Sequence, residues 1–323
     1  MGSLKNLVEL ASAWRSGVVA GYPRGFSEAP DENERPGQFV LTGSQNFLVR
    51  RQISQSLAGR CHILHLLPFS RAELKRQPLQ PVETITDRRL ASSGDDEQQV
   101  NDAQFTGGYP RIHDKNIEPQ RWLANSCQTY IERDVRALGN VGDMEAFGRF
   151  MGLCAGRTGH RLNLSALAND CGIRHTTARH WVGVLETNFV IMRLRPHHRN
   201  FNKRLVKSAK LYFLDTGLLC YLLLIRSAAD LDVHAARGAI FESWVVAEAV
   251  KNLMNRGLQP EVYFWRDSMG HEIDLLIEAG GGRLLPVEAK SGQTFTSDFV
   301  KNLAWWHNLA GSVAARGAVV YGG

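Results

Sequence analysis

The chain has 323 residues, of which 44% are hydrophobic and 22% are charged, with a net charge of +6 and a pI near 9.2. These values are ordinary for a globular protein of two or three domains with a core of useful size. The positive charge mildly favours a polyanionic partner.

The cysteines and the hydrophobic runs argue against a disulfide-linked, zinc-binding or membrane-spanning protein. The five cysteines show no C-x-x-C spacing, which excludes a recognisable zinc site or disulfide framework and indicates reduced thiols in the cytoplasm. The longest apolar run, 218–225, is too short to span a bilayer, so no membrane association is expected.

The first readable stretch lies within residues 1–75. Residues 38–44 are typical of a buried strand that ends in a polar turn, and Ser70 is a suitable N-cap for a helix that begins at Arg71. These residues carry a resemblance in three segments, namely 35–44, 56–60 and 66–74. They resemble the second half of a prokaryotic AAA-type P-loop ATPase, in a family whose C-terminal domain of unknown function has a nuclease-like fold.

The resemblance implies a place for ATP. Thr42 and Ser44 correspond to the polar tip of the sensor-1 strand, which faces the γ-phosphate, and Arg60 to a phosphate-sensing or finger arginine. The alternative for Arg60 is a surface arginine that closes a helix. We therefore expect residues 1–75 to be a partial AAA-type ATPase domain, the sensor-1 half only.

The phosphate-binding half of such a domain is not found in these 323 residues. There is no G-x-x-x-x-G-K-[ST] motif, and residues 156–161 lack the lysine and the spacing. Without that loop little remains to hold the β- and γ-phosphates or magnesium. We expect no useful ATPase activity from this chain, with the missing half either lost or supplied by a partner or a homo-oligomer.

Residues 76–160 are expected to form a helical connector, and residues 161–235 a winged helix followed by a basic segment. Helices are predicted over 164–173 and 175–186, with Gly172 permitting the turn between them, and a β wing over 189–194.

This middle region predicts contact with DNA. Thr176, Thr177 and Arg179 would lie on the exposed start of the recognition helix. Residues 193–210 hold seven Lys or Arg and no acid, a composition suited to phosphate contacts. The basic residues selected for this role are Arg199, Lys203, Arg204 and Lys207. The alternative is a winged helix that packs within the molecule beside a solvated basic strand.

The last predicted domain, residues 236–323, carries the candidate catalytic residues. A helix containing Glu242 precedes three strands, and Glu288 and Lys290 share one strand face because side chains alternate. A glycine turn at 280–282 returns the chain so that Asp274 lies beside them.

The spacing D-x13-E-x-K, with a glutamate on a preceding helix, resembles the PD-(D/E)XK nuclease superfamily. Asp274 and Glu288 would bind Mg²⁺ or Mn²⁺ through hard oxygen ligands, and Lys290 would act on the water or the phosphoryl group. Glu242 completes the predicted catalytic set. The expected fold is thus multi-domain α/β, and the function that of a DNA-binding, nuclease-like member of the ATPase family. The alternative is a non-catalytic DNA-binding or assembly protein that keeps the site as a structural relic.

Overall fold

A computed structural model describes residues 18–20, 40–42, 64–87, 97–130, 143–197 and 208–323, and has a mixed α/β architecture. The chain divides into two compact units, Met1–Leu66 and Leu67–Gly323. In the first unit, strand β1 (Val18–Ala20) pairs in parallel with β2 (Val40–Thr42), and Val19 is the register partner of Leu41.

Short helices open the second unit. They are α3 (Arg71–Leu74), the 3-10 segment η2 (Val82–Asp87), α4 (Glu97–Thr106), α5 (Pro110–Lys115) and α6 (Pro119–Thr129). The Ser70 hydroxyl accepts from the Glu73 N–H while the Glu73 carboxylate accepts from the Ser70 N–H. This capping box confirms the helix start predicted at Ser70.

Three helices follow, and a tight turn joins the last two. They are α7 (Met144–Ala155), α8 (Leu164–Cys171) and α9 (His175–Thr187). Gly172 ends α8 with a left-handed φ of 72°, which glycine adopts at little cost and which turns the chain into α9. Trp181 of α9 packs edge-on against Phe147 and Phe150 of α7, and all three side chains are buried.

Six strands form one sheet in the order β4-β3-β5-β6-β7-β8. The strands are β3 (Ile191–Pro196), β4 (Lys210–Phe213), β5 (Val262–Arg266), β6 (Glu272–Glu278), β7 (Leu284–Lys290) and β8 (Ala318–Tyr321). The β3–β5 and β7–β8 pairs are parallel and the other pairs are antiparallel. The segment expected to form a wing is β3, which lies inside this sheet, so residues 161–235 and 236–323 share it.

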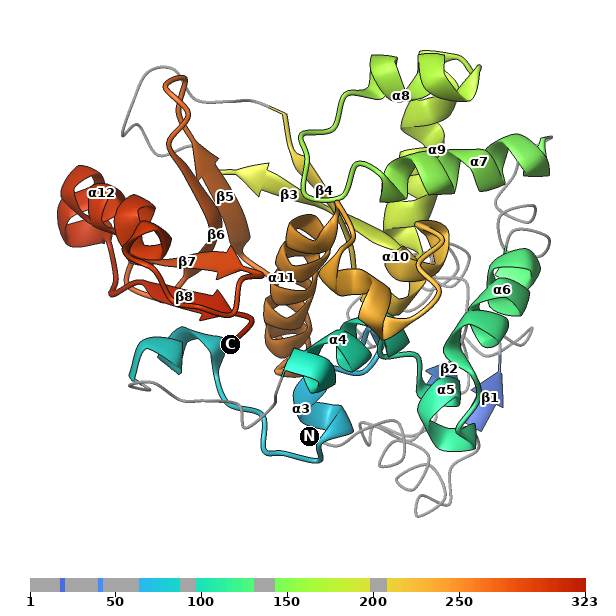
Figure 1. Ribbon diagram of the computed structural model, residues 1–323, viewed down its shortest axis with the longest axis horizontal. Coiled ribbons are helices and arrows are strands. Elements are labelled where there is room, and N and C mark those ends of the chain that lie inside the picture. Colours follow the sequence, from blue (N-terminus) through green and yellow to red (C-terminus); the bar gives the residue numbers. More distant parts are fainter. Residues whose placement is uncertain (1–17, 21–39, 43–63, 88–96, 131–142, 198–207) are drawn as a thin grey trace, which may run out of the picture. The chain divides into compact units, whose positions relative to one another are not determined.

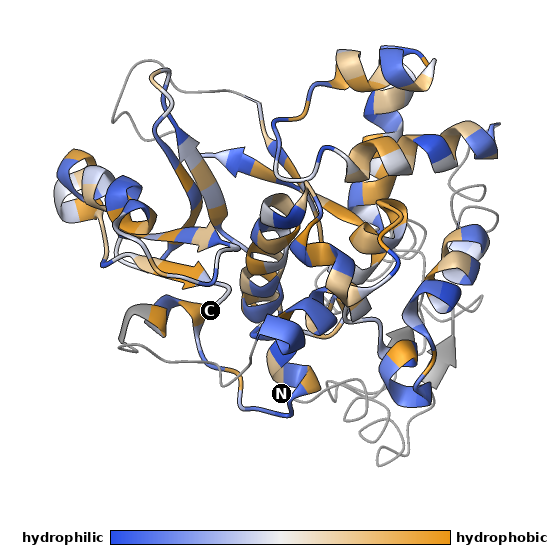
Figure 2. Ribbon diagram, viewed as in Figure 1, coloured by the Kyte–Doolittle hydropathy of each residue, from blue (hydrophilic) through white to orange (hydrophobic). Residues whose placement is uncertain are grey.

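One helix packs on each face of the sheet (Figure 1). Helix α11 (Arg237–Asn255) contributes Val246 and Val250 to a core with Leu275 and Val287. Helix α12 (Lys301–Ala310) buries Trp306 in a second core. Figure 2 shows hydrophobic and hydrophilic residues mixed along α11, as a half-buried helix requires. Strands β6 and β7 carry runs of consecutive buried residues, as strands covered on both faces do.

A compact junction joins three separated segments of this unit. The Phe69 N–H donates to the Gly108 carbonyl at 2.7 Å, and the Gly108 N–H donates to Asp215 Oδ2 at 2.7 Å. Asp215 also caps α10 (Thr216–Leu222) by accepting from the Leu218 N–H. The short segment η4 (Ala228–Asp232) then leads to α11. Among the described residues, no helix is long and apolar enough to cross a bilayer.

Candidate functional site

The candidate site lies where β6 and β7 separate. Their ladder runs from Glu278–Leu284 to Leu275–Val287, and the register between β5 and β6 shifts beside Asp274. Beyond the end of the ladder, the Ala289 N–H donates to Asp274 Oδ2 at 2.9 Å, so a side chain takes the place of a strand carbonyl. Register shifts of this kind change the direction of nearby side chains. Here the Asp274 side chain points towards β7.

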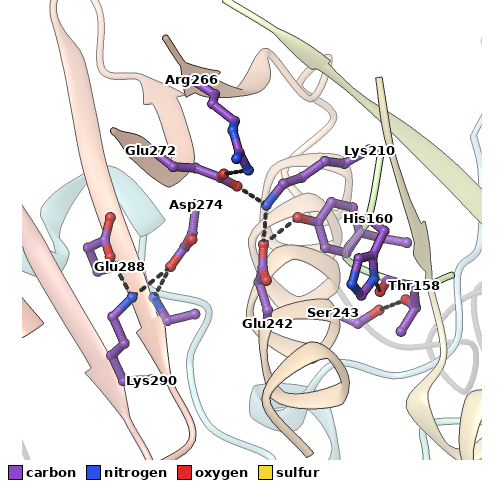
Figure 3. A network of polar contacts seen from close by, with 12 residues as sticks. Thr158, His160, Lys210, Glu242, Ser243, Arg266, Glu272, Asp274, Glu288 and Lys290 are labelled. Atoms are coloured by element: carbon purple, nitrogen blue, oxygen red, sulfur yellow. Dashed lines mark hydrogen bonds and ion pairs between the residues drawn. The ribbon is translucent and has the colours of Figure 1, made fainter. Parts of the chain in front are cut away.

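One lysine joins the two strand carboxylates (Figure 3). Lys290 Nζ lies 2.6 Å from Glu288 Oε2 and 3.4 Å from Asp274 Oδ2. The three side chains that the D-x13-E-x-K spacing selected therefore belong to one cluster. Their shared strand face arises because Glu288 and Lys290 are two residues apart on β7.

Glu288 is the most enclosed member of this cluster. Its side chain is 1% exposed, and among the described residues its Oε1 atom has no hydrogen-bond partner of good geometry, although the Asn302 side chain is close enough to lower the Glu288 pKa. Burial and the neighbouring Asp274 carboxylate raise the pKa of Glu288 to about 7, while Lys290 acts in the opposite direction. The pKa of Lys290 is raised because Asp274 and Glu288 together outweigh its own burial. The arrangement thus leaves one carboxylate oxygen that a further cation or donor could satisfy.

Glu242 belongs to a second, adjacent cluster on the α11 side. Its Oε1 atom accepts from Lys210 Nζ at 2.8 Å and from the Tyr212 hydroxyl at 2.5 Å. Lys210 also forms an ion pair with Glu272, which in turn binds Arg266. The Asp274 carboxylate acts to raise the pKa of Glu242, so the two clusters are close enough to interact (Figure 3).

The charges of the two clusters influence one another. Burial lowers the pKa of Lys210, but the Glu242, Glu272 and Asp274 carboxylates outweigh it and raise that pKa. Burial also raises the pKa of Glu242, and Lys210 and Asp274 act on it in opposite directions. The site as a whole is a set of mutually compensated buried charges.

Lys210 corrects one sequence expectation. It is the last cation of the basic run that was assigned to phosphate contacts, yet it is 4% exposed and paired with two carboxylates. A signal was present in the sequence, because the hydrophobic run 211–214 follows immediately and is typical of a buried strand. Lys210, Tyr212, Glu272 and Arg266 were not selected as site residues from the sequence.

The residues predicted to contact DNA are only partly described. Thr176 and Arg179 are exposed on the first turns of α9, and Thr177 is half-buried beside them. Arg193 forms an ion pair with Glu186 of α9. The other selected residues, Arg199, Lys203, Arg204 and Lys207, lie outside the described residues.

The nucleotide-proximal residues lie in the first unit. Thr42 is the last residue of strand β2. Ser44 and Arg60 lie outside the described residues, so their predicted proximity to a nucleotide stays a prediction.

Comparison with known families divides the chain into three matched segments. Residues 26–75 match a family described as an AAA domain. Residues 97–229 match one domain of unknown function (DUF8612), and residues 237–323 match another (DUF4143). The last of these contains Glu242, Asp274, Glu288 and Lys290, while Lys210 falls in the preceding match.

Two curated relatives are similar to the chain. They are the Uncharacterized protein Mb2031c of Mycobacterium bovis and the Uncharacterized protein Rv2008c of Mycobacterium tuberculosis. Each is 28% identical over 253 residues, which cover 78% of this chain and 52% of the relative. The chain thus spans about half the length of the curated relatives it matches. No solved structure matches it significantly.

Proposed function

We propose that the C-terminal part of this protein is a nuclease-like unit of the PD-(D/E)XK type, which binds a divalent cation and acts on phosphodiester bonds in DNA. One observation carries the proposal: Asp274 and Glu288 reach the same lysine from two neighbouring strands at the point where those strands part. Two carboxylates and one ammonium group therefore lie within a single cluster.

The residues present suit a divalent cation. Among the described residues, Glu288 Oε1 is a buried oxygen with no hydrogen bond of good geometry, and the Asp274 carboxylate is close enough to raise the Glu288 pKa. Mg²⁺ and Mn²⁺ favour carboxylate oxygens and complete their coordination with water and phosphate. A bound cation would lower the pKa of a water molecule and stabilise charge on a phosphate.

The chain's own residues have separable roles in this proposal. Asp274 and Glu288 hold the cation. Lys290 stabilises negative charge on the phosphoryl group and orients the attacking water, since its Nζ already lies between the two carboxylates. Glu242 lies on the α11 side of the same site and contributes negative charge next to Asp274.

DNA binding is assigned to the middle region as a winged helix. The exposed first turns of α9 would enter the major groove through Thr176, Thr177 and Arg179, and the basic segment would contact phosphates. The strand expected as a wing is β3, so the wing of this proposal is built into the sheet that also carries the candidate site.

ATP binding is proposed for the whole protein only. The AAA-domain match supports membership of an ATPase-type family, and the 323 residues contain no P-loop motif. We infer that nucleotide binding needs residues supplied by a partner or by a further part of the protein. Isothermal titration of this chain with ATP and magnesium tests this inference, and a micromolar dissociation constant would contradict it.

A second candidate function is a non-catalytic DNA-binding or assembly protein. The observation that favours it is internal neutralisation, because Lys290 and Lys210 pair with the carboxylates of the site. In addition, among the described ranges of the chain, no three His, Cys, Asp or Glu side chains converge as a metal-binding group. In this alternative the lysines stabilise the fold and the site does no chemistry.

Cleavage of DNA in the presence of Mn²⁺ or Mg²⁺ separates the two candidates. The nuclease proposal requires cation-dependent cleavage that Asp274→Ala abolishes. The matched control is Glu278→Ala, which changes a carboxylate on the same strand but away from the cluster. Cleavage that survives Asp274→Ala would place the chemistry elsewhere, and no cleavage with either cation would favour the non-catalytic function.

A further inference from the structure

Glu242 is enclosed by segments of the protein that are far apart in the sequence. On one side, β4 presents Lys210 and Tyr212, which both donate to the same carboxylate oxygen. On another side, the loop before α8 passes close by, because a Cβ atom added to Gly159 would lie 3.5 Å from Glu242 Oε2. Such enclosure leaves the carboxylate little freedom to change its rotamer.

Lys210 joins helix α11 to the sheet at this point. Its ammonium group binds Glu242 of α11 at 2.8 Å and forms an ion pair with Glu272 of β6, two residues before Asp274. It also lies 5.6 Å from the centre of the Phe264 ring on β5. One buried cation therefore connects the helix that carries Glu242 to the strand that carries Asp274 (Figure 3).

A second buried lysine provides a comparison. Lys251, which lies on α11 like Glu242, is 3% exposed and contacts Glu248 at 3.4 Å and the Phe69 carbonyl at 3.2 Å. These contacts hold the segment around Phe69 against the helix and involve no residue of the candidate site. The two lysines are thus alike in burial and charge but differ in what they hold.

We propose that Lys210 and Tyr212 are positioning residues for Glu242, which they hold facing Asp274 in the nuclease-like site. The inference rests on the proposed function, because it assigns roles within the same site. Neither residue touches the reacting phosphate. Lys210 sets the position of the helix carboxylate relative to β6, and the Tyr212 hydroxyl sets its orientation.

The test is a kinetic comparison of variants in the full chain. Lys210→Met should lower kcat for cation-dependent DNA cleavage by about 100-fold, because small displacements of a catalytic group have effects of this order. KM for DNA should stay within about 2-fold, since the proposed function assigns DNA binding to α9 and the basic segment. Lys251→Met is the matched control and should change kcat by less than about 2-fold if it folds as the parent does.

A double-variant comparison separates positioning from a general structural role. If Lys210 acts through Glu242, then adding Lys210→Met to Glu242→Gln should lower kcat no further. Lys210→Arg keeps the charge and should recover at least about 10-fold of the activity that Lys210→Met loses. Tyr212→Phe keeps the buried ring, and should lower kcat about 10-fold in the parent and leave kcat unchanged in Glu242→Gln.

The outcomes are distinguishable. Losses that add in the double variants, or a fall in kcat that Lys251→Met matches, would overturn the positioning role while leaving the proposed function intact. If Lys210→Met does not fold, Tyr212→Phe decides the inference by the same criterion. A parent protein that does not cleave DNA with either cation would overturn the proposed function, and with it the assignment of Lys210 and Tyr212.

Discussion

The Ala289 N–H donates to Asp274 Oδ2 at 2.9 Å, immediately beyond the last paired residues of β6 and β7. Asp274 therefore has a structural role, because it accepts a hydrogen bond from a strand N–H, in addition to its candidate role as a metal ligand. The two roles can be separated, because an amide oxygen accepts a hydrogen bond but has no negative charge.

Asp274→Asn should retain the hydrogen bond from Ala289 and lower the free energy of unfolding by less than Asp274→Ala does. The alanine variant leaves a partly buried N–H without its acceptor, which costs about 1–3 kcal/mol. Both variants should lose cation-dependent cleavage, because Asn cannot replace a carboxylate ligand of Mg²⁺ or Mn²⁺. Urea unfolding and a cleavage assay measure the two effects, and equal destabilisation by both variants would contradict the structural role.

Glu288 predicts a pH dependence of stability. Burial, followed by the Asp274 carboxylate, raises its pKa from 4.5 to about 7 in the folded protein. The folded state then binds a proton more tightly than the unfolded chain, so the stability present at low pH is lost as the pH rises from about 4.5 to about 7. Glu288→Gln should remove this pH-dependent loss of stability, which amounts to about 3 kcal/mol over the whole range.

Unfolding midpoints in urea at several pH values between 5 and 8 measure this effect. Glu278→Gln, on the neighbouring strand, is the control and should keep the slope of the parent protein. If Glu288→Gln and the parent lose stability in parallel over this range, Glu288 does not titrate as its surroundings require.

Substitution of two glycines, Gly108 in the junction and Gly183 in α9, should change stability in opposite directions. A Cβ atom at Gly108 would lie 2.2 Å from the Phe69 carbonyl oxygen, a backbone atom. Gly108→Ala should therefore destabilise the fold by about 1–3 kcal/mol or more. Gly183 lies within α9, where an added Cβ atom would meet no heavy atom within 4 Å, and Gly183→Ala should stabilise by about 0.5–1 kcal/mol. Thermal unfolding compares the two variants directly. If Gly108→Ala unfolds at the same temperature as the parent protein, Gly108 does not pack closely against Phe69.

The proposed DNA interface predicts a salt dependence. Neutralising Arg199, Lys203, Arg204 and Lys207 should weaken binding and reduce the slope of log K against log salt by about one unit for each lost phosphate contact. Arg149→Ala is the control, because this exposed arginine of α7 is already paired with Glu145. Fluorescence anisotropy at several salt concentrations gives both quantities. An unchanged slope would mean that these residues do not meet phosphate.

Local pattern was enough to predict several elements of the second unit. The alternation around Asp274 and Glu288, the glycine turn between their strands and the helical spacing after Phe241 each predict a structure from neighbouring residues alone. The turn at Gly172 and the cap at Ser70 were predictable for the same reason, because their physics involves only a few adjacent residues.

Lys210 shows what the tertiary structure decided. In the sequence it is the last residue of a basic run, and only the hydrophobic run 211–214 that follows distinguishes it from the cations predicted to contact phosphate. Its role depends on Glu242 and Glu272, which are 32 and 62 residues further along the chain and which meet it only when α11 packs on the sheet. The sequence by itself determined the strand pair and the D-x13-E-x-K cluster, because both follow from strand alternation and one hairpin. The charges that compensate Glu242, and the place of β3 within the sheet, required long-range packing, since burial and electrostatic partnership depend on distance in space and not along the chain.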